Sequence, residues 1–117
     1  MTRDDDYLRD LLFQYEASDE WLLMMPGDTL GSSEEEQRER YHVMLLMDVG
    51  FATDVGRGTF RLTSLGHDYI NAVRSDTVWT KTKDGANKIG GATLGIMKDL
   101  AIAYLKQEAA SKLEINL

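Results

Sequence analysis

The chain has 117 residues, of which 43% are hydrophobic and 28% charged, a composition typical of one folded domain and not of a disordered chain. It contains no cysteine, which excludes disulfides, thiol catalysis and cysteine-based zinc sites. The net charge of −7 has the wrong sign for a protein that grips nucleic acid over its whole surface, although the acids are concentrated in residues 1–50, which hold 13 acids and four arginines.

The first predicted element is a helix from Asp4 to Ala17. Its apolar residues recur at helical spacing, and three aspartates in its first turn suit the positive end of the helix dipole. Residues 21–25 form a short apolar run that predicts a strand or extended segment, which ends in a turn at residues 26–28.

A capping box of Ser33 and Glu36 predicts a second helix, which continues to about Asp48 and ends at Gly50. A break near Glu36 is left open. Tyr41, Met44 and Leu45 form the expected stripe of this helix, and whether Asp48 belongs to it is left open.

A β-hairpin is predicted next, from strands at residues 51–55 and 59–63 around a glycine-bearing turn. Thr63 or Ser64 then caps a helix over residues 65–74. Its expected inward side chains are Leu65, Tyr69, Ile70 and Val73.

Two further helices are predicted in the remainder of the chain. The first is capped by Ser75 or Asp76 and runs to Lys88, and Gly90 and Gly91 break the chain after it. The last runs from Thr93 to about Lys112.

This order of elements is that of a winged-helix domain, and we therefore predict a mostly helical α+β fold with a winged-helix (winged helix-turn-helix) core. The hairpin at 51–63 would be the wing, and the helix at 36–48 would occupy the recognition position. We interpret residues 1–117 as a single domain, in which residues 1–75 form the core and residues 76–117 a C-terminal helical extension.

Four segments carry a narrower resemblance. They are Arg3-Asp4-x-Asp6-x-x-Arg9-x-Leu11-Leu12, Tyr41-His42-x-x-Leu45-Leu46-x-Asp48-x-Gly50, Leu62-Thr63-x-x-Gly66-His67-Asp68-Tyr69-Ile70 and Asp76-x-Val78-Trp79-x-Lys81-Thr82-Lys83. Together they resemble, over essentially the whole chain, the bacterial family known as domain of unknown function 2513, which is often encoded in prophages and mobile elements. The chain departs from the family pattern at Ser64, where the family tends towards tryptophan, and in the acid- and glycine-rich residues 26–36.

No constellation points to catalysis. The acids cluster at helix starts, where capping explains them, and Gly90-Gly91 lacks the lysine of a phosphate loop. His42 and His67 lie 25 positions apart in no metal-binding pattern, and we expect each to pack and to satisfy a local backbone group. The alternative for His42, on the recognition-type helix, is contact with a base edge. We therefore predict no enzyme, cofactor, metal or small-molecule ligand.

The sequence shows neither a membrane-spanning segment nor a signal peptide. The longest apolar run, Val43 to Met47, is too short to span a bilayer, and the N-terminus is acidic. We expect a cytoplasmic protein with no membrane partner.

Duplex DNA is the first candidate partner, because arginine can form bidentate hydrogen bonds with guanine or phosphate, and glutamine with adenine. The candidate contacts, on the second helix and on the wing, are Gln37, Arg38, Arg40, Arg57 and Arg61. Four glutamates on the same helix would repel a phosphate backbone.

The alternative is an acidic protein–protein interaction module that does not bind DNA. Its partner would be a host or phage protein, or a second copy docked through the last helix. The candidate dimer interface consists of Met97, Leu100, Ala101, Tyr104 and Leu105, and the other interpretation is that this stripe only packs across its own domain. DNA binding predicts that the four arginines converge on one basic surface, whereas a protein module predicts an acidic or apolar face there.

Overall fold

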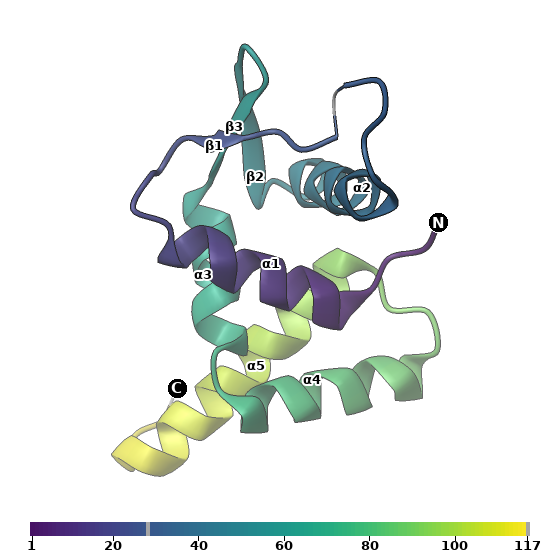
Figure 1. Cartoon of the computed structure of the whole chain (residues 1–117). Helices are drawn as coiled ribbons and strands as arrows, with labels where there is room; N and C mark the ends of the chain where they lie inside the picture. The colour runs from purple at the N-terminus through teal and green to yellow at the C-terminus, as the bar shows by residue number, and fades with distance from the viewer. Residues whose placement is uncertain (28, 117) are drawn as a thin grey trace. The chain divides into compact units, whose positions relative to one another are not determined.

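The computed structural model describes residues 1–27 and 29–116 (Figure 1). Over these residues, five helices and three strands follow one another in the order α1–β1–α2–β2–β3–α3–α4–α5. The mostly helical α+β class is therefore confirmed. Two compact units, Met1–His67 and Asp68–Leu117, meet at a boundary within α3.

The predicted elements are present with nearly the expected ends. The helices span Asp5–Ala17 (α1), Glu34–Asp48 (α2), Ser64–Val73 (α3), Asp76–Ile89 (α4) and Leu94–Leu113 (α5), and the strands span Leu23–Met24 (β1), Ala52–Gly56 (β2) and Thr59–Leu62 (β3). No break interrupts α2. The turn expected at residues 26–28 includes Asp28, which lies outside the described residues.

Side-chain caps begin all five helices, and the sequence predicted those of α2, α3 and α4. In each case a side-chain oxygen accepts a hydrogen bond from a backbone N–H of the first turn, which has no partner within the helix. The capping side chains are Asp4 for α1, Ser33 for α2, Thr63 for α3, Ser75 for α4 and Thr93 for α5. Ser33 and Glu36 form the full capping box.

The sheet belongs to the first unit and has the strand order β1–β3–β2, with both pairs antiparallel. Along β3, Phe60 and Leu62 are buried and Arg61 is exposed, which is the alternation that a one-sided sheet requires. The hairpin turn needs three successive residues with positive φ, and two of them are glycines: Gly56 (97°), Arg57 (56°) and Gly58 (71°).

One prediction about α2 was wrong. The fully buried residues of this helix are His42, Val43 and Leu46, whereas Met44 is 48% exposed and Asp48 is exposed. Five consecutive apolar residues cover more than one turn of about 3.6 residues, so the sequence does not determine which of them face inward. Leu65 of α3 is likewise 37% exposed and does not face inward as expected, although Tyr69, Ile70 and Val73 are buried.

The second unit is dominated by the packing of α4 on α5. Gly90 ends α4 in the left-handed conformation (φ 71°), as predicted. Gly85 lets the two helices approach, because a Cβ there would lie 3.1 Å from the Tyr104 hydroxyl and 3.6 Å from a Leu100 methyl. The buried residues of this unit include Val78, Trp79, Leu94, Met97 and Ala101.

Thr63 joins the end of the hairpin to the start of α3. Its hydroxyl donates to the Gly50 carbonyl and accepts from the Gly66 N–H, and its own N–H donates to the Phe51 carbonyl. The first turn of α3 thereby lies directly against the start of the hairpin. A Cβ on Gly66 would stand 2.1 Å from the Phe51 carbonyl oxygen, a distance that no side chain can adopt without movement of the backbone.

Gly66→Ala should therefore destabilise the protein by about 1–3 kcal/mol, because it overpacks a backbone contact. Gly95→Ala in α5 is the matched control: its Cβ would meet nothing closer than 3.8 Å, so the better helix propensity of alanine should add up to about 1 kcal/mol. Urea unfolding of both variants measures the difference. Equal stability of the two would contradict the close approach at Gly66.

Candidate interaction surface

A buried histidine joins α1 to α2. His42 is 0% exposed; its Nε2 accepts from the Asp4 N–H at 3.0 Å, and its Nδ1 lies 2.8 Å from the Arg38 carbonyl oxygen. Because Nε2 accepts, Nδ1 must carry the proton and donate to that carbonyl. The ring also packs edge-on against Tyr7 and Tyr41, at centroid distances of 4.8 and 5.4 Å. The expected packing role of His42 is confirmed, and the side chain is not available to a base edge.

The two arginines of α2 are held by their own chain. Arg38 forms an ion pair with Asp4 at 2.8 Å, and its guanidinium lies 3.9 Å from the centroid of the Tyr7 ring. Both partners of the ion pair are more than a third exposed, so the pair adds at most about 1 kcal/mol, but it fixes the direction of the guanidinium. Arg40 donates to the Pro26 carbonyl at 3.3 Å.

The remaining candidates for nucleic-acid contact are Gln37 on α2 and Arg57 and Arg61 on the hairpin. Gln37 is exposed and lines a hollow together with Arg38. Arg57 is exposed in the hairpin turn, and Arg61 donates to the Leu62 carbonyl at 3.1 Å while lining a different hollow. Arg40 lines a third hollow. The structure does not gather the five residues around one cavity.

Two tyrosines of α1 donate to two glutamates of α2. The Tyr7 hydroxyl lies 3.1 Å from Glu35, and the Tyr15 hydroxyl lies 2.6 Å from Glu39. Burial, followed by the hydrogen bond to Glu35, raises the pKa of Tyr7 to about 12. Burial and the bond to Glu39 also raise the pKa of Tyr15. Each hydroxyl occupies one acceptor site of its carboxylate, and Glu35 remains exposed whereas Glu39 is half-buried.

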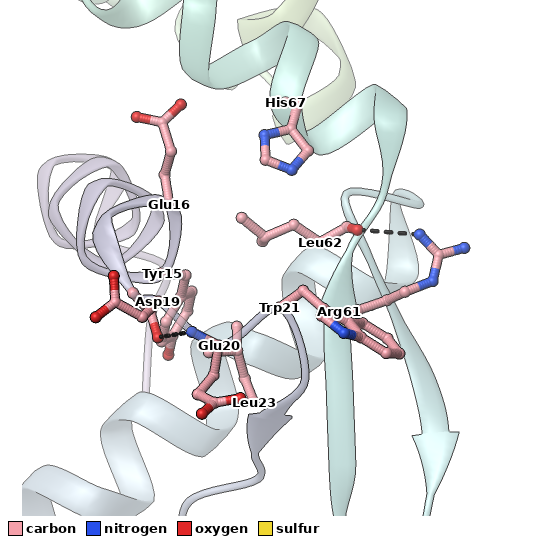
Figure 2. Close-up of a pocket in the computed structure, with 10 residues that line it drawn as sticks. Tyr15, Glu16, Asp19, Glu20, Trp21, Leu23, Arg61, Leu62 and His67 are labelled. Carbon is pink, nitrogen blue, oxygen red and sulfur yellow. Dashed lines mark hydrogen bonds between the residues drawn. The ribbon is translucent and has the colours of Figure 1, made fainter.

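The first hollow of the unit, of about 290 Å³, lies between α1, β1, β3 and the start of α3 (Figure 2). Glu16 and His67 project on either side of it, and Trp21, which is 69% exposed, forms part of its wall. His67 is exposed, so the expectation that it would pack was wrong: it lies in the first turn of α3 and lines this open hollow.

The hollow that Arg40 lines, of about 200 Å³, lies between α2, the hairpin and the segment after β1, and we call it the methionine groove. Its lining residues are Met25, Arg40, Met44, Met47, Asp54, Gly58 and Thr59. Three of the six methionines of the chain thus meet in one place. Met24, beside Met25 in the chain, is 76% exposed.

The exposure of the apolar side chains Trp21, Met24 and Met44 was not predicted from the sequence. A signal was present, because the apolar runs at residues 21–25 and 43–47 are each five residues long. A two-residue strand or one face of a helix can bury only part of such a run, so the remainder must face solvent or a partner.

The family model described as "Hypothetical protein (DUF2513)" matches residues 2–93. The chain belongs to this family. The match covers nearly all of the first unit and the second unit as far as Thr93, the cap of α5. It confirms the family that the sequence segments resembled. The chain matches no curated protein and no solved structure.

Of the dimer-interface residues predicted for this DUF2513 chain, Met97 and Ala101 are buried within the chain itself. Leu100 and Tyr104 are half-buried and lie against Gly85 of α4, and Leu105 is also half-buried. Self-association through α5 stays a prediction, but much of this stripe is already used within the second unit.

Two other findings concern the described residues alone. No group of three or more His, Cys, Asp or Glu side chains that could hold a metal ion occurs among them. Within residues 1–27 and 29–116, no helix is long and apolar enough to cross a membrane.

Because the folded protein keeps a proton on Tyr7 up to about pH 12, whereas an exposed tyrosine releases it near 10.0, stability should fall as pH rises through this window. The double variant Tyr7→Phe/Tyr15→Phe should lose less stability over the same window. Urea midpoints from pH 9 upward measure both slopes. Parallel slopes would show that these hydroxyls are not held as the structure places them.

His42→Phe keeps an aromatic ring but leaves the part-buried Asp4 N–H without its acceptor, and it should cost about 1–3 kcal/mol. The control is His67→Phe, an exposed site in the same unit, which should change stability by less than about 0.5 kcal/mol. Thermal unfolding monitored by circular dichroism compares the two variants. An unchanged melting temperature in His42→Phe would argue against the role of His42 in joining α1 to α2.

Proposed function

We propose that the first unit of this DUF2513 chain is a non-enzymatic, winged-helix-type module that binds a protein and not duplex DNA. The winged-helix interpretation is supported by the order α1–β1–α2–β2–β3–α3 and by the pairing of β1 with β3 beside the hairpin. One difference is that residues 25–27 and 29–33 contain no helix, so the described part has only the recognition-position helix of a helix-turn-helix pair.

The observation that carries the proposal is the surface of α2. Its first turn exposes Glu34, Glu35 and Glu36, while Arg38 and Arg40 are bound by the chain's own Asp4 and Pro26. A helix that presents carboxylates where DNA phosphates would lie repels them. Residues 1–67 hold 14 acids and six arginines, a net charge of −8 in that unit.

Exposed apolar side chains favour the same function. Trp21, Met24 and Met44 are 69%, 76% and 48% exposed, all in the first unit. Tryptophan and methionine are enriched at protein interfaces, where they supply large contact areas. An acidic unit that also exposes apolar side chains suits a basic protein surface better than it suits a nucleic acid.

In the prophage setting that the family resemblance implies, the partner would be a host or phage protein in the cytoplasm. DNA binding is the second candidate, and the feature that favours it is the exposed Arg57 at the tip of the hairpin, the usual place of a wing contact.

Fluorescence anisotropy with mixed duplex DNA, first at low and then at moderate salt, separates the two candidates. We expect no binding even at low salt, where attraction to phosphate is strongest. Salt-sensitive binding that is lost in Arg57→Ala/Arg61→Ala would overturn the proposal in favour of DNA.

Capture from extracts of cells that encode the chain tests the protein partner. Glu34→Lys/Asp48→Lys reverses two exposed charges of the first unit and should reduce recovery of the captured protein at least tenfold. The control Asp84→Lys/Asp99→Lys makes the same charge change in the second unit and should leave recovery unchanged. Equal loss in both variants, or in neither, would contradict recognition through the acidic unit.

A further inference from the structure

We propose that the methionine groove binds a basic segment of the partner protein, whose apolar side chain enters the groove while its cationic side chains face the surrounding carboxylates. This inference rests on the proposed function and names the chemistry of the bound segment.

The walls of the groove are suited to an apolar side chain. Met44 and Met47 come from α2 and Met25 from the segment after β1, and they face the hairpin at Gly58 and Thr59. Methionine side chains are unbranched and polarisable, so they adapt to different apolar shapes. The Met44 side chain is 48% exposed, which leaves it accessible to a partner without any rearrangement of the fold.

The size of the groove selects a side chain and not a whole ligand. At about 200 Å³, it lies below the range of about 300–1,000 Å³ that is usual for small-molecule pockets. A single leucine, methionine or phenylalanine of a protein segment is of the right order. The rest of such a segment would lie across the rim of the groove.

Charge around the groove selects a basic segment. Asp54 lines the groove, and exposed Asp48 follows Met44 by one turn of α2. Arg40 is the one cation in the lining and offsets one of these two carboxylates, so the groove and its edge keep a net charge of −1. With a net charge of −8 on the unit, cationic side chains on either side of the apolar anchor are attracted, and a second copy of the same face is repelled.

Methionine methyl NMR tests the proposal directly. The intact chain, labelled at the methionine methyl groups, gives one probe for each of its six methionines. It is titrated with a synthetic amphipathic peptide of leucine and lysine at helical spacing. We expect saturable shifts of Met25, Met44 and Met47, and an unshifted Met97, which is buried in the second unit.

Matched peptides separate the two parts of the recognition. Replacement of lysine by glutamate, or of leucine by alanine, should weaken binding at least tenfold. In the protein, Met44→Lys should have the same effect, because it places a cation in the groove. Ile89→Lys is the control, since it adds the same charge at a 54% exposed site in the second unit. Circular dichroism confirms that both variants fold.

Failure of this inference differs from failure of the proposed function. Shifts spread over all methyl groups, or equal binding by Met44→Lys and the wild type, would overturn the groove as the site while leaving a protein partner in place. No shift with the lysine peptide, together with a captured cellular protein, would overturn the basic apolar chemistry alone. A chain that binds duplex DNA and captures no protein would refute the function itself.

Discussion

The packing of α1 on α2 depends on one buried ring. His42 can be buried only because both of its nitrogens are satisfied, one by the Asp4 N–H and one by the Arg38 carbonyl. This pairing places Asp4 where its side chain can also cap α1 and bind the Arg38 guanidinium. The two tyrosine–glutamate hydrogen bonds add further polar contacts between α1 and α2. A polar network therefore determines which residues of α2 remain accessible, and it removes an arginine that looked accessible from the sequence.

Most of the fold could be predicted from local chemistry. Caps such as Ser33 and Ser75, and the glycines of the hairpin turn, act over a few residues, so their consequences are visible in the sequence. Which side of α2 faces the core could not be predicted, because its run of apolar residues extends around the whole helix. The candidate contacts were predicted by residue type alone, and type does not reveal that Arg38 and Arg40 are bound within the chain. The exposed methionines were missed for the converse reason, since apolar residues were assigned to the core.

The chain separates charge between its units. The first unit carries −8, whereas residues 68–117 hold six acids and seven bases, a net charge of +1. Acids at helix starts stabilise α1 and α2 through the helix dipole, and the same acids give the first unit its negative electrostatic potential. Local helix stability and long-range recognition therefore use the same side chains, which explains how so acidic a surface is compatible with a stable fold.

The Thr63 junction has a consequence for how the chain assembles. Its hydroxyl reaches back 13 positions to the Gly50 carbonyl, whereas the His42–Asp4 bond spans 38. The entropy lost on closing a loop grows with its length, so the hairpin and the first turn of α3 can form at a smaller entropic cost than the docking of α1. The order of assembly that entropy favours begins in the middle of the chain, and α1 closes over a hairpin that is already formed.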